Sequence, residues 1–183
     1  WWDESLSLQR AESDWGSLLV GRLWIEDGIK RIATTDQHPF GYFMLLGLFV
    51  RLAGESEFVL RFPSVMAATL LLPGLWALGR AFVRRGLLPP ATPVFALFLA
   101  GGSPFYLWYG QEARMYTAVA LLAVISSYGL VRWAEERESA TRRWRLLLYL
   151  TTVAAFLSTH YFAALLLPIH GLVLVGGVQR RRK

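Results

Sequence analysis

Side chains of the kinds that catalyse group transfer occur in four short, widely separated segments. They are Asp3 and Glu4, His38, the tetrapeptide Gln111-Glu112-Ala113-Arg114, and His160 with Tyr161. A carboxylate beside a reacting carbon can take the proton of an attacking hydroxyl group, and an arginine or a helix N-terminus can stabilise an anionic leaving group. The four segments therefore hold the groups that such a transfer needs, provided that the fold brings them together.

Each segment also allows a purely structural interpretation. Acidic residues are favoured in the first turn of a helix, so Asp3 and Glu4 fit the start of a surface helix equally well. Glu112 and Arg114 fit a local ion pair at a membrane interface, and a histidine before a proline, as at His38, is more often structural than catalytic. No segment decides between the two interpretations alone.

The composition indicates a membrane protein. Of the 183 residues, 55% are hydrophobic and only 17% are charged, whereas soluble domains carry about 25% charged residues. This apolar content excludes intrinsic disorder, and the absence of cysteine excludes a disulfide framework and cysteine-based zinc sites. The net charge is +6, but the basic residues lie between apolar runs, which indicates membrane topology rather than nucleic-acid binding.

Apolar runs with few charges follow one another from residue 58 onward, and crossing the hydrocarbon core of a bilayer takes roughly 20 helical residues. They predict about five transmembrane helices, over residues 58–83, 87–109, 115–131, 146–159 and 161–178. The last two come from one uncharged run that is too long for a single span and is interrupted by Ser158-Thr159-His160-Tyr161. Inside this run, His170 is expected to be a core histidine bonded to a backbone group.

Three basic clusters between these spans set the expected orientation. They lie within residues 80–85, 132–145 and 180–183. Loops rich in Lys and Arg face the cytoplasm, so residues 1–57, the 111–114 turn and the 158–161 break all fall on the outer side. The expected fold is an all-α polytopic membrane bundle over residues 58–183, preceded by an outer first loop over residues 1–57.

Two further helices are expected within the outer loop. Residues 38–53 are apolar but too short to span, and placing them across the membrane would invert all three basic clusters. They therefore predict a re-entrant or interfacial helix. Upstream, apolar residues recur at steps of three and four from Leu8 to Leu23, as in an amphipathic helix lying on the membrane surface. Arg61 is expected to snorkel or to pair with Glu57.

Four blocks of sequence occur in an order known from one enzyme superfamily. The blocks are WWDES at 1–5, DQHPFGYFMLLGLFVRLAGESEFVLRFPS at 36–64, SPFYLWYGQEARMYTAVALL at 103–122 and STHYFAALLLP at 158–168. Together they resemble the polyprenyl-phosphate-sugar-dependent membrane glycosyltransferases of the GT-C fold, among them protein O-mannosyltransferase-like enzymes and the aminoarabinose transferases of lipid A. In that family an Asp-Glu pair follows a first transmembrane helix. The resemblance therefore implies a fragment truncated at both ends.

The resemblance also implies roles for individual residues. Asp3, with Glu4 beside it, matches the catalytic base, and Glu112 matches a second outer acid. Arg114 is the preferred contact of the lipid phosphate, because His38 stands where some relatives have lysine. The further candidates for contacts with the phosphate and the sugar are Gln111, His160 and Tyr161. Some relatives bind a divalent metal here, whose possible ligands would be Asp3, His38, Glu112 and His160.

The implied reaction is one inverting displacement that moves a sugar from a polyprenyl-phosphate donor to a hydroxyl group of a protein, lipid or glycan. It would take place on the outer face of a bilayer, in bacteria the cell membrane, and would involve no nucleic acid. Two alternatives stay open, namely a catalytically inactive lipid-binding subunit and a transporter for lipid-linked sugars. A transporter would place ionisable groups near the middle of its spans. Apart from His170, the interiors of the predicted spans are uncharged, and the polar residues cluster at one face.

Overall fold

The computed structural model describes residues 2–27, 30–36 and 38–180, with the backbone alone described for residues 2, 3, 25–27, 30–34 and 175–180. In chain order its elements are α1 Trp2–Glu12, α2 Trp15–Leu19, β1 Arg22–Asp27, β2 Lys30–Thr35, α3 Gly41–Ala53, α4 Glu57–Arg84, α5 Thr92–Gly101, α6 Pro104–Gly110, α7 Tyr116–Glu135, α8 Ser139–Thr159, the 3-10 helix η1 Tyr161–Leu165 and α9 Leu166–Arg180. Helices therefore make up most of the described chain, as the composition predicts.

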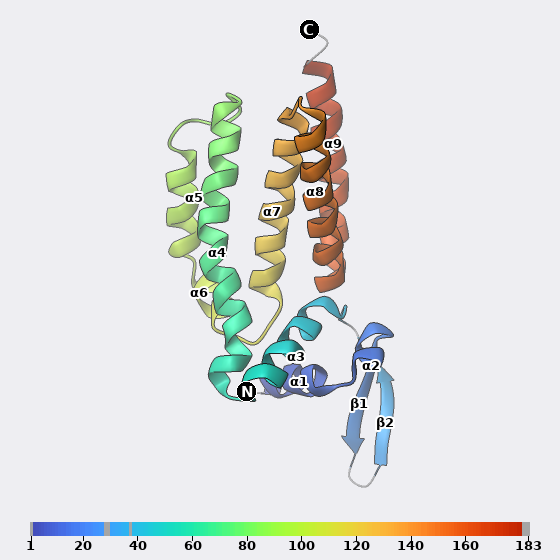
Figure 1. The fold of residues 1–183 in the computed structure, drawn as a ribbon. Helices are drawn as coiled ribbons and strands as arrows, with labels where there is room; N and C mark the ends of the chain where they lie inside the picture. Colours follow the sequence, from blue (N-terminus) through green and yellow to red (C-terminus); the bar gives the residue numbers. More distant parts are fainter. Residues whose placement is uncertain (1, 28–29, 37, 181–183) are drawn as a thin grey trace.

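The helices from α4 onward form an up-and-down bundle. α4 runs away from α3, α5 and α6 return beside it, and α7, α8 and α9 then alternate in direction (Figure 1). α7 packs against both α4 and α8, and α9 packs against α7 and η1. The connections at residues 111–115 and at His160 consequently lie at the end of the bundle that carries α1, α2, α3 and the strands. We call this end the α1–α3 end.

Two helices in the described part of the chain, α4 with 28 residues and α7 with 20, are long and apolar enough to cross a membrane. α3 and α5 are shorter apolar helices, and large side chains of the bundle such as Phe98 and Leu99 are exposed. Exposed apolar surface along a helical bundle is expected where lipid surrounds it. The count of about five crossings stays a prediction.

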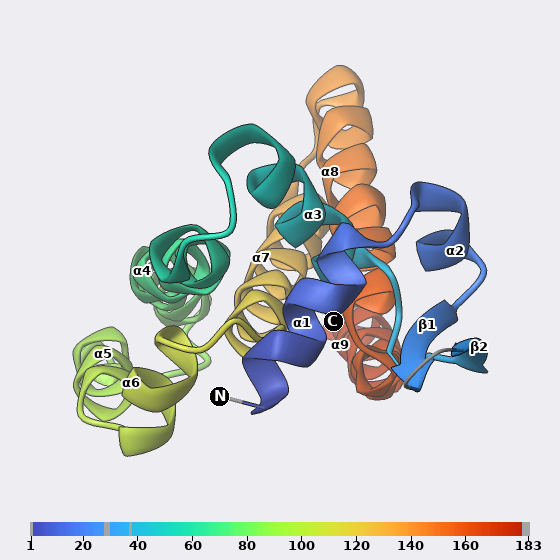
Figure 2. The ribbon, with the colours of Figure 1, turned by 90° about the horizontal axis from the view of Figure 1, so that it is seen from below.

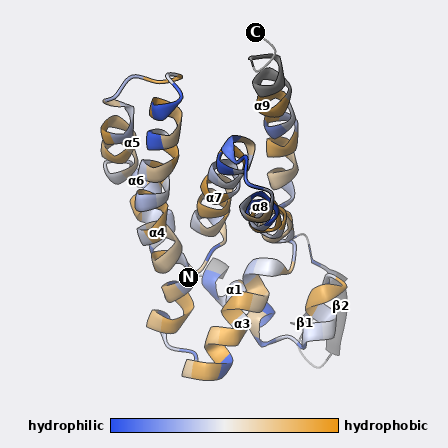
Figure 3. Cartoon of the chain, turned by 45° about the horizontal axis from the view of Figure 1, so that its top comes forward, coloured by the Kyte–Doolittle hydropathy of each residue, from blue (hydrophilic) through white to orange (hydrophobic). Residues whose placement is uncertain are grey.

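The first two basic clusters lie at the end of the bundle opposite the α1–α3 end. Figure 3 shows hydrophilic residues gathered there on α4 and α7. Arg85 donates from Nε to Oε1 of Glu135 at 2.9 Å, and Arg145 lies 2.8 Å from Glu136, so these pairs join α4 and α8 to the end of α7. Residues 181–183 of the third cluster lie outside the described residues. The helices thus alternate in the directions that the first two clusters require.

The predicted span over residues 87–109 is not one helix. The pair Pro89-Pro90 precedes α5, and Gly101-Gly102-Ser103-Pro104 separates α5 from α6. Ser103 caps α6, its Oγ accepting a hydrogen bond from the backbone N–H of Tyr106 at 3.4 Å. Proline removes a backbone donor and glycine weakens a helix, so an uncharged run with both is divided. α6 instead extends the bundle toward the α1–α3 end.

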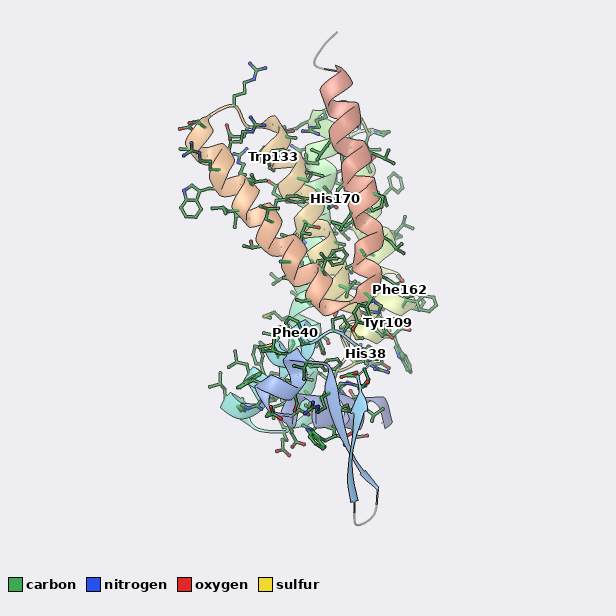
Figure 4. All side chains as sticks on the ribbon, turned by 90° about the vertical axis from the view of Figure 1, so that its right-hand side faces the viewer. His38, Phe40, Tyr109, Trp133, Phe162 and His170 are labelled. Atoms are coloured by element: carbon green, nitrogen blue, oxygen red, sulfur yellow. The ribbon has the colours of Figure 1, made fainter. Side chains whose placement is uncertain are left out.

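The all-α expectation is wrong for residues 22–35, which contain an antiparallel strand pair. β1 pairs with β2 so that Trp24 lies opposite Ala33 and Arg22 opposite Thr35. In Figures 1 and 4 the pair projects from the α1–α3 end, away from the bundle. A short sheet within the predicted outer loop is thus an addition to the helical fold.

The prediction of one amphipathic helix from Leu8 to Leu23 is also wrong, because the helical structure is interrupted twice in this segment. α1 ends at Glu12, and the Asp14 carboxylate then caps α2 by accepting a hydrogen bond from the backbone N–H of Ser17 at 2.8 Å. Gly21 follows with a φ of 66°, a conformation that glycine adopts readily, and leads into β1. The cap and the glycine outweigh the helical spacing of the apolar residues.

α3 crosses the end of the bundle beside α1, within the segment where residues 38–53 predict a helix (Figure 2). Its buried face carries Tyr42, Phe43, Leu46, Gly47 and Val50. The larger of these side chains share one apolar core with Ala11 and Leu18 of the preceding helices and with Ala113 and Met115, which precede α7. This core ties the N-terminal segment to the connection between α6 and α7.

His170 of α9 was expected to bond to a backbone group, but in the structure both of its ring nitrogens contact side chains. Its Nε2 lies 3.1 Å from the Ser127 hydroxyl of α7, and its Nδ1 lies 3.1 Å from the Tyr149 hydroxyl of α8. Figure 4 shows it well inside the bundle, far from His38. His170 therefore joins three helices through polar contacts and takes no part in the α1–α3 end.

Replacing Gly47 by alanine is expected to destabilise the packing of α1 on α3. An added Cβ would lie 2.6 Å from the carbonyl oxygen of Ala11 and 2.7 Å from Nη1 of Arg51. These two groups bond to each other at 2.8 Å, so neither can easily move away. We expect a loss of about 1–3 kcal/mol in the free energy of unfolding, measured by chemical denaturation in detergent.

Gly171→Ala in α9 is the matched control, because nothing lies within 4 Å of a Cβ added there. This replacement is expected to be neutral or slightly stabilising, since alanine favours a helix. Equal stability of the two variants would contradict the close approach of α1 and α3.

Candidate active site at the α1–α3 end

Glu4 of α1 and Arg61 of α4 form a bidentate ion pair. Arg61 donates from Nε to Oε1 of Glu4 at 2.8 Å and from Nη2 to Oε2 at 3.0 Å. It also lies 3.5 Å from Glu57, the partner expected from the sequence. The Glu4 carboxylate accepts a further bond from the backbone N–H of Ala113, and the bonds from Arg61 are the main cause of a lowered pKa of Glu4. Glu4 thus joins α1, α4 and the connection before α7.

Asp3 lies in the first turn of α1, directly before this ion pair. Its backbone is helical, and its side chain is outside the described part of the chain. Because Glu4 holds the same turn to Arg61 and Ala113, the position of Asp3 along the chain is at the junction of α1, α4 and the 111–115 connection. Of the acid pair that the sequence singled out, the Glu4 carboxylate is therefore held in an ion pair, and Asp3 precedes Glu4 in the same helical turn.

The connection between α6 and α7 presents Gln111, Glu112 and Arg114 at this junction. Glu112 accepts a hydrogen bond from the indole Nε1 of Trp108 at 2.6 Å, and Gln111 donates to the carbonyl of Leu107 at 3.2 Å. Arg114 lies between two fully buried residues, Ala113 and Met115. Its carbonyl accepts from the Ser64 hydroxyl of α4 at 2.8 Å, which fixes the backbone from which its side chain extends.

His38 lies beside a buried ion pair that sequence reasoning did not find. Arg10 of α1 donates from Nε to Oδ2 of Asp36 at 2.8 Å, and both side chains are less than a tenth exposed. The backbone N–H of His38 donates to Oδ1 of Asp36 at 3.1 Å, and its Nδ1 lies 3.5 Å from the same oxygen. Burial, together with the charge of Arg10, lowers the pKa of His38. Because the ordinary pKa of a histidine is about 6.5, this lowering favours the neutral imidazole at pH 7.

His160 and Tyr161 lie at the same end of the bundle, where α8 gives way to η1. Nδ1 of His160 accepts a hydrogen bond from the backbone N–H of Phe162 at 3.2 Å, and the two rings stack with centroids 5.2 Å apart. The Tyr161 side chain is exposed. The His160 ring also lies against the Tyr116 ring of α7, with centroids 6.4 Å apart. The expected role of His160 and Tyr161 in substrate binding stays a prediction.

Aromatic side chains of α6 and η1 lie near the α1–α3 end. Figure 4 shows Tyr109 and Phe162 close to the end that holds His38. On α6 an open hollow of about 260 Å³ is lined by Pro104, Phe105, Trp108 and Tyr109. Exposed aromatic residues at one level of a lipid-facing bundle are typical of a membrane–water interface. The junction of α1, α4 and the 111–115 connection is thus close to an exposed apolar surface on α6.

The described residues do not form a ready metal site. Among them, no group of three or more His, Asp or Glu side chains is close enough to hold a metal ion. Glu112 bonds to Trp108, and Nδ1 of His160 bonds to the backbone at Phe162. The Asp3 side chain is outside this test. The metal ligands named from the sequence stay a prediction.

A lipid-facing helical bundle that gathers carboxylates, arginines and a histidine at one end fits the class of membrane-embedded group-transfer enzymes. Residues 37–183 match the family model of dolichyl-phosphate-mannose-protein mannosyltransferase, and the chain belongs to this family. It is therefore a membrane glycosyltransferase that uses a lipid-phosphate-linked sugar, which confirms the resemblance noted in the sequence. The match begins after Asp3 and Glu4. No curated protein and no solved structure matches the chain.

Sequence reasoning missed the two ion pairs that hold α1 because their members are far apart. Arg10 and Asp36 are 26 residues apart, and Glu4 and Arg61 are 57 residues apart. Local spacing carries no information on such pairs. For Arg61 the one available signal is its apolar neighbourhood from Phe58 to Pro63, where a charge needs a partner. Arg10 has polar neighbours and gives no such signal.

Arg61→Gln is expected to lose stability in a pH-dependent way. The ion pair lowers the pKa of Glu4 in the folded state below its unfolded value, so the pair stabilises the fold above the unfolded pKa. We expect the variant to be about 1–3 kcal/mol less stable than wild type at pH 7. This difference should shrink as the pH falls below the ordinary pKa of a glutamate, about 4.3, and on through the lower folded-state pKa of Glu4.

Unfolding in detergent at pH 7, 5 and 3 measures this difference. Arg22→Gln, at an exposed arginine of β1, is the control and should differ little from wild type at any of the three pH values. A stability loss in Arg61→Gln that is the same at pH 7 and pH 3 would contradict a role for Glu4 as its partner.

Proposed function

We propose that the α1–α3 end transfers a mannosyl group from a polyprenyl-phosphate donor to a hydroxyl group of a protein, with inversion, on the outer side of the membrane. The observation that carries the proposal is the junction of α1, α4 and the 111–115 connection through Glu4, Arg61 and Ala113. It places the first turn of α1 next to Arg114, at the end opposite the first two basic clusters. The family supports the donor and the protein acceptor.

In this proposal Asp3 is the general base. The acceptor oxygen attacks the anomeric carbon while the hydroxyl proton passes to the Asp3 carboxylate, and the bond from the anomeric carbon to the phosphate oxygen breaks. The bonding electrons leave with the polyprenyl phosphate, which gains one negative charge. Glu4 is already engaged with Arg61, so we assign it the positioning of α1 and not the proton transfer.

Arg114 is the proposed partner of the departing phosphate. A guanidinium group donates two parallel hydrogen bonds to a phosphate, and such charge-assisted bonds are about twice as strong as neutral ones. The lowered pKa of His38 favours its neutral form, which suits a hydrogen bond to the phosphate better than an ion pair. The hollow on α6 is next to the connection that bears Arg114 and offers apolar surface for the first part of the isoprenoid chain.

Transfer by the full-length protein in lipid nanodiscs tests the proposal. The donor is a polyprenyl-phosphate mannose of β configuration, the acceptor is a serine- and threonine-containing peptide, and the product linkage is determined by NMR. An α-linked mannosyl peptide is the expected product. A retained β linkage would exclude the single displacement. Family membership does not favour the inactive subunit or the transporter. Donor binding without transfer to any hydroxyl acceptor would support one of these two alternatives instead of the transferase.

A further inference from the structure

A chain of three hydrogen-bonding groups runs from α3 through α4 to the backbone of Arg114. The Tyr42 hydroxyl lies 2.8 Å from Oγ of Ser64, and this Oγ lies 2.8 Å from the carbonyl oxygen of Arg114. Tyr42 and Ser64 are buried almost completely, with 1% and 0% of their surface exposed. The chain therefore lies inside the core beside the proposed site.

The direction of the bonds follows from counting protons. The carbonyl of Arg114 can only accept, so the single hydroxyl proton of Ser64 points toward it. The Tyr42 hydroxyl must then donate to Ser64 Oγ. Burial raises the pKa of Tyr42, so this proton stays in place throughout the physiological range. Thr117 of α7 donates to the backbone carbonyl of Ser64 at 3.1 Å, which joins α4 to α7 at the same level.

The backbone at Arg114 is held from both sides. Its carbonyl is bonded to Ser64, and its N–H donates to the carbonyl of Glu112 at 2.8 Å. The charge of Arg114 in turn acts on the pKa values of both His38 and Tyr42. The guanidinium group thus lies within electrostatic range of α3 and of the segment that precedes it.

We propose that Tyr42 and Ser64 are positioning residues of the transferase, which fix the Arg114 backbone so that its guanidinium group meets the donor phosphate. The proposal rests on the proposed function of Arg114. A group that is fixed before the reaction stabilises developing charge without having to reorganise. Without the chain, Arg114 keeps its charge but samples other positions, and the transition state loses part of its stabilisation.

A purely structural role for the two hydroxyl groups predicts a different result. It would lower stability and lower all kinetic parameters together, regardless of what residue 114 is. A positioning role acts through the Arg114 side chain, so its effect must vanish once that side chain is removed. A double-mutant cycle separates the two roles, because residues that act as a unit are not additive.

The experiment measures kcat/KM for polyprenyl-phosphate mannose with the full-length protein in nanodiscs. Tyr42→Phe and Ser64→Ala are made in the wild type and in Arg114→Ala. We expect each to lower kcat/KM for the donor about tenfold in the wild type, with KM for the acceptor peptide unchanged, and to cause no further loss in Arg114→Ala. Ser126→Ala is the matched control, since this serine is fully buried and its hydroxyl donates to the carbonyl of Ala123 within the same helix, α7.

Two results would overturn the inference. One is wild-type donor kinetics in Tyr42→Phe, which removes a single oxygen and preserves the ring. The other is a tenfold loss that recurs in the Arg114→Ala background. Wild-type kinetics in Arg114→Ala itself would instead show that the proposed function of Arg114 is wrong, so the two failures are distinguishable.

Discussion

Replacing Asp3 by asparagine is expected to lower the rate of mannosyl transfer by about 10³-fold while donor binding is retained. Asparagine has nearly the shape of aspartate but cannot take up the hydroxyl proton, and a positioned general base contributes about 10²–10⁴-fold to the rate of a reaction. Because the neighbouring Glu4 is held by Arg61 and Ala113, we do not expect it to replace the missing base. The measurement is single-turnover transfer from labelled donor to peptide.

Asp14→Asn is the matched control for this variant. Asp14 is also an acidic residue of the N-terminal segment, but its carboxylate caps α2 by accepting the N–H of Ser17. Asparagine caps helices about as well as aspartate, so Asp14→Asn should fold and transfer like the wild type. Wild-type transfer by Asp3→Asn would show that another group takes the proton, and Glu112 would be the next candidate.

Arg114→Ala is expected to lower kcat/KM for the donor by about 10²-fold or more. Removal of one positioned donor to a developing negative charge typically costs 10²–10³-fold in rate. The leaving phosphate gains charge as the bond to the sugar breaks, so we expect most of the loss in kcat. Arg114→Lys retains the charge but not the paired N–H groups, and an intermediate rate is expected.

The control for Arg114 is Arg22→Ala, which removes an exposed arginine of β1 from the same end of the molecule. Its kinetics should equal those of the wild type if the effect is specific to the site. A loss confined to the acceptor KM in Arg114→Ala would place this arginine beside the acceptor and contradict its contact with the phosphate.

The helices of the bundle could be predicted from the sequence because lipid-facing segments are governed by local rules. Long uncharged runs predict α4 and α7, and the polar residues around His160 coincide with the break between α8 and η1. Residues 87–109 show the limit of this approach. Their mean polarity is that of a span, but the prolines and glycines within them decide that α5 and α6 are separate helices.

The N-terminal segment was harder to predict, since competing local signals of similar strength occur there. The apolar spacing from Leu8 to Leu23 favours one helix, whereas the Asp14 cap and the positive φ of Gly21 end it. The sequence signal that could have indicated the strands is Asp27-Gly28, a dipeptide typical of hairpin turns, which stands between two runs rich in β-branched and aromatic residues. A short two-stranded sheet is stable only through its context, and here Gln9 of α1 donates to the carbonyl of Trp24 in β1 at 2.8 Å.

The sequence by itself determined the class of protein, the chemistry-bearing residue types and the family, since composition, apolar run length and ordered motifs are properties of the chain alone. The tertiary structure decided which of these residues meet. It placed Arg61 on Glu4, Arg10 on Asp36 and the Ser64 hydroxyl on the Arg114 carbonyl, each across 26 or more residues of chain. Such pairs depend on how helices pack, because a buried charge or hydroxyl bonds to whatever partner the packing brings within reach.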